Sequence, residues 1–156
     1  MKLSFSWIGL IVFALPMLIN IAYVLLPPTD KAPHAAPVTR WVEYVEKGSR
    51  IAYLLAIVLL VNRLPVSWRS AWLMLAALFL LLYYAVWLRY FAGGRKTELL
   101  RRAFLLVPLP LAVFPVLYYL CAAIWLHNVP AVIIMLIFDA AHITVSLQSF
   151  RKEENR

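Results

Sequence analysis

The chain has few of the residues that secreted domains and hydrolytic enzymes use for their chemistry. Its 156 residues include one cysteine, Cys121, and seven Asp and Glu residues against fifteen Lys and Arg residues. One cysteine excludes an internal disulfide and a cysteine-based metal framework. The sequence contains no GxSxG, HExxH or CxxC pattern, so serine hydrolase, zinc protease and thiol redox chemistry have no motif behind them.

Apolar residues, by contrast, are in excess. They make up 65% of the chain, and its mean hydropathy is +0.84. Soluble domains are about 45–50% apolar, and a water-soluble core of this size could not bury the surplus. A lipid environment removes the problem, because the outer faces of helices can then be apolar too. The composition predicts one all-α domain, a multi-pass bundle of transmembrane helices.

Five stretches are apolar and long enough to cross a bilayer of about 30 Å. They are residues 3–26, 38–62, 68–90, 98–126 and 130–150. The second stretch is the weakest, because its first turns carry charges. Glu43 with Lys47 and Glu46 with Arg50 have the i,i+4 spacing that favours ion pairs on one helix.

Proline, glycine and asparagine mark the ends of these helices. Pro27 and Pro28 end the first, and residues 29–39 are expected to form a loop. Gly93 and Gly94 end the third, and Thr97 is expected to cap the fourth. Asn128 is a candidate N-cap for the fifth helix, with Pro130 in its first turn.

Lys and Arg are distributed unevenly between the two ends of such a bundle. Lys2, Arg63 and Arg69 fall at the end that holds the N-terminus, and the other twelve fall at the opposite end. Because cytoplasmic loops carry the excess of Lys and Arg, the count predicts an outside N-terminus and a cytoplasmic C-terminus. The expected location is a plasma membrane of the bacterial type. The expected interfacial aromatic residues are Trp7, Trp68, Trp72 and Trp125 outside, with Trp41, Trp87 and Tyr90 inside.

The net charge of +8 does not indicate a nucleic-acid partner, because no basic soluble domain is present to carry that function. Lipid is the better partner for basic residues that lie between apolar stretches. Anionic lipid headgroups are expected near Arg95, Lys96, Arg101 and Arg102. A membrane-protein partner or a second copy of the chain is also compatible with the small polar segments.

The fifth stretch carries the clearest candidate for a polar site. Asp139 lies nine residues into it, about 14 Å deep, where an ionisable side chain is a functional hypothesis by default. His142 and Ser146 follow on the same helix face, and Asn20 in the first stretch lies level with them. These four residues are predicted to form a ligand or proton site. The alternative is hydrogen bonding between helices without a ligand.

The fourth stretch contains Pro108, Pro110 and Pro115. Each removes an amide donor, so the carbonyls of Phe104, Leu106 and Leu111 could be left without helical partners. Such carbonyls beside Asp139 would suit a cation, a proton relay or a polar ligand, and the alternative is a kink satisfied by neighbouring helices. No metal site is predicted, because Asp139 and His142 provide only two ligands.

In size, five-span layout, aromatic content and long first loop the chain resembles the translocator protein (tryptophan-rich sensory protein) family. The resemblance is one of architecture. The Trp- and Pro-rich stretch typical of that family is reduced here to Pro37-Val38-Thr39-Arg40-Trp41, so no binding residue is carried over. Fold-level resemblance implies little about function.

Three functions follow from these observations. The first is binding or transport of a small molecule or ion at a polar intramembrane site. The second is a structural or regulatory subunit of a membrane complex, and the third is an intramembrane enzyme that uses Asp139 and His142 as acid and base. The sequence does not identify a cofactor.

Overall fold

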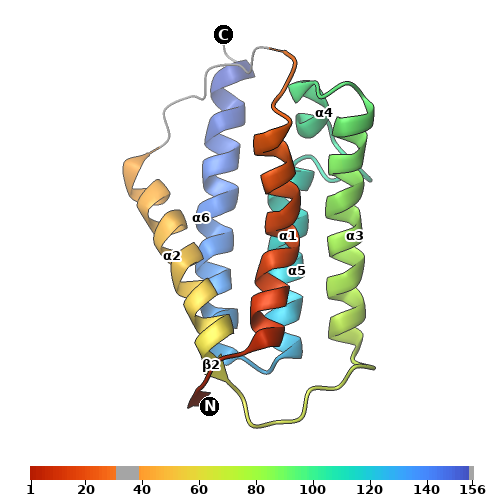
Figure 1. Cartoon of the computed structure of the whole chain (residues 1–156). Helices are drawn as coiled ribbons and strands as arrows, with labels where there is room; N and C mark the ends of the chain where they lie inside the picture. The colour runs from red at the N-terminus through yellow and green to blue at the C-terminus, as the bar shows by residue number, and fades with distance from the viewer. Residues whose placement is uncertain (31–38, 155–156) are drawn as a thin grey trace.

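The protein folds into an upright bundle of helices with its two termini at opposite ends (Figure 1). The structure is a computed structural model, and it describes residues 1–30 and 39–154, with side chains as far as Gln148. The five long helices are α1 (Trp7–Leu25), α2 (Arg40–Leu59), α3 (Ala71–Ala92), α5 (Pro110–Trp125) and α6 (Val129–Glu154). The remaining elements are the short helix α4 (Thr97–Arg101) and the two-residue strands β1 (Lys2–Leu3) and β2 (Leu60–Val61).

The long helices are neighbours in the order α1, α2, α6, α5, α3, and α3 returns to α1. Three of them, α1, α3 and α6, are long and apolar enough to cross a membrane. Most of their side chains are not buried inside the bundle, so the fold presents apolar outer faces that suit lipid. Helix α5 is apolar but shorter, and α2 carries the charges noted above.

The expected helix over residues 98–126 is divided in the structure. α4 ends at Arg101, residues 102–109 are not helical, and α5 begins at Pro110. Proline is favoured in the first turn of a helix, so Pro110 starts α5 rather than breaking it. α6 continues past the expected end at residue 150. Four charges of the topology count, Lys31, Arg151, Lys152 and Arg156, lie outside the described side chains.

Helix-end predictions hold in three places. α3 ends at Ala92 with Gly93 as its C-cap, and Asn128 accepts a hydrogen bond from the Ala131 amide at the start of α6. Pro130 is in the first turn of that helix. Thr97, in contrast, is the first residue of α4 and not its N-cap.

The expected aromatic belt is only partly present. Trp7, Trp41, Trp68 and Trp72 are exposed, as membrane-interface residues would be. Trp87, Tyr90 and Trp125 are instead 5%, 0% and 4% exposed. Their rings therefore belong to the interior. The prediction was wrong for these three residues because hydropathy along one helix does not reveal which face meets its neighbours.

The end of the bundle that holds the N-terminus is tied together by hydrogen bonds between segments that are far apart in the chain. β1 pairs antiparallel with β2, Lys2 opposite Val61 and Leu3 opposite Leu60. The buried Asn128 side chain donates to the carbonyls of Ala56 and Leu60, 2.8 Å away in each case. One amide therefore caps the start of α6 and the end of α2 at once.

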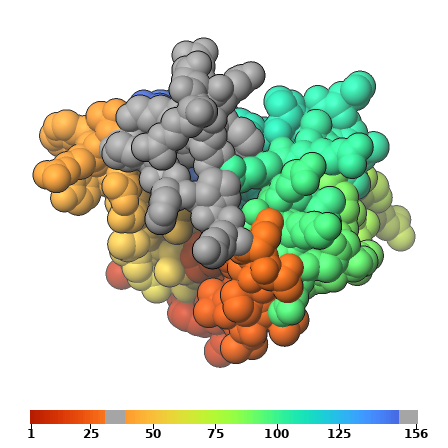
Figure 2. Space-filling view, turned by 90° about the horizontal axis from the view of Figure 1, so that it is seen from above, coloured from red at the N-terminus to blue at the C-terminus, as the bar shows by residue number. Residues whose placement is uncertain are grey.

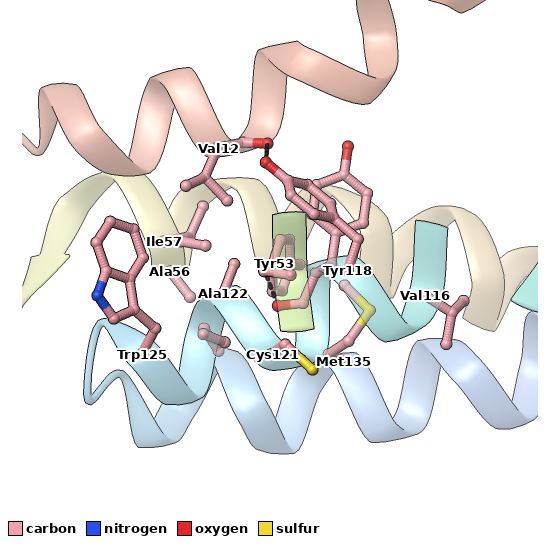
Figure 3. Packing of buried hydrophobic residues seen from close by; sticks show 14 of the residues in the cluster. Val12, Tyr53, Ala56, Ile57, Val116, Tyr118, Cys121, Ala122, Trp125 and Met135 are labelled. Atoms are coloured by element: carbon pink, nitrogen blue, oxygen red, sulfur yellow. Dashed lines mark hydrogen bonds between the residues drawn. The ribbon is translucent and has the colours of Figure 1, made fainter. Parts of the chain in front are cut away.

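Pro16 lies inside α1 and has no N–H to donate to the carbonyl of Val12, one turn earlier. The Tyr118 hydroxyl donates to that carbonyl at 2.8 Å (Figure 3). Tyr119 donates to the next carbonyl, that of Phe13, at 3.0 Å. Two hydroxyls from α5 thus bond to the turn of α1 that precedes Pro16. A transmembrane helix that contains proline needs such partners for the freed backbone groups.

At the opposite end, the segment after α1 is clamped to the start of α4. The Asp30 carboxylate accepts hydrogen bonds from the Thr97 amide and hydroxyl, and the Thr29 hydroxyl donates to the Gly94 carbonyl. The Thr97 hydrogen bonds hold the pKa of Asp30 below its ordinary value, because they favour the charged form.

This clamp should weaken in acid. Since the pKa of Asp30 is lowered on folding, the contribution of its carboxylate to stability is complete above the unfolded pKa of about 3.9. That contribution is lost as the pH falls through the folded pKa. Hydrogen exchange should report a falling protection factor at the Thr97 amide over that range. Asp30→Asn keeps a hydrogen-bond acceptor without a charge, so the protection factor of the Thr97 amide in this variant should not vary with pH. The same pH profile in both proteins would contradict the assignment.

Candidate functional site

A cavity of about 260 Å³ lies inside the bundle, in the half nearer the C-terminal end. All five long helices contribute to its wall, which is mostly aromatic and apolar. The lining residues are Phe13, Met17, Asn20, Arg50, Tyr53, Tyr83, Trp87, Leu111, Pro115, Tyr119, Met135, Phe138 and His142. We refer to it as the central cavity.

One side of the central cavity carries amide, hydroxyl and indole groups. Tyr83 donates its hydroxyl hydrogen to Asn20 Oδ1 at 2.9 Å. The Asn20 amide nitrogen donates to the Met17 sulfur at 4.0 Å, which is a weak acceptor. Asn20 therefore retains donor capacity toward the cavity.

Trp87 supplies a further donor to this wall. Its indole N–H is buried and has no hydrogen-bond partner within the described part of the chain. The Tyr83 hydroxyl lies close to the indole, but no acceptor among the described residues meets hydrogen-bond geometry with the Trp87 N–H. A buried donor without an acceptor costs about 1–3 kcal/mol, and an acceptor on a bound molecule would remove that cost.

A charged cluster of Glu46, Arg50 and His142 joins α2 to α6 beside the cavity. Glu46 Oε1 lies 2.8 Å from Arg50 Nη2 and 2.8 Å from His142 Nδ1. The His142 ring stacks on Phe138, with centroids 5.1 Å apart, and the Arg50 guanidinium lies over the same Phe138 ring. The Glu46 side chain is 10% exposed and that of Arg50 51%. The cluster therefore extends from the buried interface toward the surface.

Pro115 and Leu111 form part of the wall supplied by α5. Pro115 lies inside the helix and has no N–H for the Leu111 carbonyl. Of the three residues whose carbonyls were expected to lose helical partners, Leu111 is the one that lines the central cavity. The Phe104 carbonyl, in contrast, accepts from the Val107 amide.

A second cavity, of about 240 Å³, lies between α1, α3 and α5 nearer the N-terminal end. No polar surface lines it among the described residues. Tyr118 faces this second cavity and Tyr119 faces the central one, and both bond to α1. The two tyrosines separate a fully apolar space from one with hydrogen-bonding groups.

The predicted site residues fall into two groups in the structure. His142, Asn20 and Pro115 line the central cavity, whereas Asp139, Ser146, Pro108 and Pro110 are not among its lining residues. Asp139 lies on α6 with its Oδ1 atom buried and without a hydrogen-bond partner in the described residues. A functional role for any of the seven stays a prediction. The described residues also contain no group of three His, Cys, Asp or Glu side chains placed to hold a metal ion.

Most residues of the central cavity wall were not predicted from the sequence. The interactions of Glu46 with Arg50 and of Glu43 with Lys47 are present as predicted, but the contact of Glu46 with His142 was not expected. A carboxylate and an imidazole on two apolar stretches could have suggested it, since buried ionisable groups pair. The aromatic side of the cavity had no such signal, because buried and lipid-facing aromatic residues look alike in a sequence.

Comparison of the chain with protein-family models, with curated proteins and with solved structures finds no match.

Proposed function

We propose that this chain is a five-span membrane protein that binds a small, mostly apolar molecule in the central cavity, with the N-terminus outside and the C-terminus in the cytoplasm. The bound molecule has an aromatic or aliphatic body and one hydrogen-bond acceptor. The unpartnered indole N–H of Trp87 on the cavity wall carries this proposal.

The membrane part of the proposal is supported by the helices and by the charges. α1, α3 and α6 are long and apolar enough to cross, and α2 and α5 pack between them in the same bundle. The termini lie at opposite ends (Figure 1), as an odd number of spans requires. Lys2, Arg63 and Arg69 lie at the N-terminal end, so the excess of positive charge favours a cytoplasmic C-terminal end.

The chemistry of the wall supports binding of such a molecule. Ligand sites are concave, mostly apolar, and contain a few placed polar groups that orient the ligand. The wall combines Phe13, Met135 and Phe138 with donors on Asn20 and Trp87. Glu46 already neutralises Arg50, so the cavity suits a neutral acceptor such as a ketone or an ester better than a strong anion.

Benzophenone is a suitable probe, because it has two aromatic rings, a ketone acceptor and photochemistry that labels methionine. Illumination of the purified protein with benzophenone should label Met17 or Met135, which border the cavity. Met74 is 63% exposed and serves as the internal marker of unspecific labelling. Peptide mass spectrometry measures the ratio of labelling at Met17 and Met135 to labelling at Met74.

Trp87→Phe should weaken this labelling about five- to tenfold, as expected for a lost hydrogen bond of about 1–1.5 kcal/mol. Trp72→Phe is the matched control, because Trp72 is outside the cavity and partly exposed. Diphenylmethane lacks the ketone and should compete poorly. Labelling of Met74 alone, or equal labelling of both tryptophan variants, would refute the proposal.

A further inference from the structure

The coil between α4 and α5 would lie within the lipid layer, where irregular backbone is uncommon. α5 has 16 residues and is therefore about 24 Å long, whereas the hydrocarbon layer is about 30 Å thick. With its Trp125 end at one boundary, its Pro110 end stops short of the other. Residues 102–109 then continue, without helix, at the depth of the acyl chains or the adjoining headgroups.

Arg89 and a short hairpin satisfy the backbone of this coil. The Arg89 guanidinium donates to the carbonyls of Leu99, Arg102 and Ala103 at 2.6, 2.7 and 3.2 Å. Phe104 and Val107 exchange two backbone hydrogen bonds. Irregular backbone at membrane depth requires such compensation, so the segment is built to stay near lipid.

Leu105 and Leu106 form the tip of the hairpin and face outward. They are 65% and 100% exposed, and both have left-handed backbone conformations, with φ of 49° and 67°. That conformation costs about 1–2 kcal/mol for a residue other than glycine. Asn-Gly would form the same two-residue turn without that cost. Turn formation therefore does not explain why leucine occupies these two positions.

Basic residues lie on both sides of α4, a few residues before this tip in the chain. Lys96 and Arg102 are exposed, and Arg95 is partly exposed. Two acidic residues lie at α4: Asp30, which is engaged by Thr97, and the exposed Glu98 of α4 itself. The basic residues remain in excess of these two. In Figure 1 the coil after α4 passes behind α3, and in Figure 2, which looks onto this end, the turquoise atoms of the segment after α4 reach the edge of the molecule. The apolar tip and the basic residues beside α4 therefore belong to the same end of the bundle, where a lipid leaflet would meet it.

We propose that α4 and the Phe104–Val107 hairpin form a binding site for an anionic phospholipid in the leaflet at this end. Leu105 and Leu106 contact the acyl chains, and Arg95, Lys96 and Arg102 contact the headgroup phosphate. A phospholipid fits better than a soluble phosphate, because a soluble ion leaves the two leucines without a partner. The site is independent of the central cavity.

Native mass spectrometry of the full chain with phosphatidylglycerol or phosphatidylcholine tests the charges. The protein should retain phosphatidylglycerol in preference. Arg95→Gln/Lys96→Gln/Arg102→Gln should reduce that retention by up to about fivefold per charge, since each is worth about 1 kcal/mol at an anionic surface. Lys2→Gln/Arg63→Gln/Arg69→Gln removes the same charge at the other end and should have no effect. Equal losses in both variants, or equal retention of the two lipids, would overturn the proposal.

Leu105→Asn/Leu106→Gly tests the tip. Its unfolding temperature in detergent should equal or exceed that of the original chain, because Asn-Gly suits the turn. Retention of phosphatidylglycerol should nevertheless fall, and glycerol phosphate should not displace the lipid from the original chain. Unchanged lipid retention in this variant, or displacement by glycerol phosphate, would show that the leucines are not part of the site.

Discussion

Replacing Asn128 with alanine should lower the free energy of unfolding by about 3 kcal/mol. The substitution removes the N-cap of α6, worth about 1 kcal/mol, and two hydrogen bonds to the end of α2, worth about 1 kcal/mol each. Asn128 is 2% exposed, so water cannot replace these partners without opening the interface. Unfolding by dodecyl sulfate in mixed micelles can be followed by the reaction of Cys121 with a fluorogenic thiol dye, because this cysteine is buried.

Two further variants test how much the Asn128 hydrogen bonds contribute to stability. Asn128→Ser keeps a capping oxygen and loses both donors, so it should recover only about 1 kcal/mol of the loss. Asn62→Ala removes two exposed hydrogen bonds, one to the His127 carbonyl and one from the Leu64 amide. Because water can replace both partners, it should cost no more than about 1 kcal/mol. If Asn128→Ala were no worse than Asn62→Ala, the double capping role would be wrong.

The second large effect is expected at Gly9, where α1 crosses α2. A Cβ atom on Gly9 would lie 2.0 Å from the carbonyl oxygen of Ile57, so the two backbones would have to separate. Gly9→Ala should therefore destabilise the protein by about 2–3 kcal/mol, as overpacking against a rigid neighbour does. Small residues permit this kind of close approach between membrane helices.

Gly48 is the matched control, because it is also inside a helix and a Cβ there would meet nothing within 4 Å. Gly48→Ala should stabilise the protein by about 0.5–1 kcal/mol, through the lower conformational entropy of the unfolded chain. The two substitutions are chemically identical and should have opposite signs in the same unfolding assay. A stabilising Gly9→Ala would mean that the helices do not cross as closely as described.

Some features of the fold were predictable because their physics is local. Apolar length indicates helices suited to lipid, and Gly93 and Asn128 end or begin helices through their own backbone and side-chain preferences. The i,i+4 pairs of α2 depend only on helical spacing. The division near residue 102 was missed because three prolines were interpreted as breaks within one helix, whereas Pro110 begins a helix of its own.

The candidate site depended on contacts between residues far apart in the chain. Nothing local indicates that Tyr118 meets Val12, that Glu46 meets His142, or that Trp87 faces a cavity rather than the membrane interface. Those pairings follow from which helix faces meet, and the Gly9 crossing and the Asn128 caps help to set them. Hydropathy and helix ends are local properties, so they are sufficient to predict an all-α chain with helices suited to a membrane. Which side chains surround the central cavity depends instead on the packing of the bundle, because five separate helices contribute to its wall.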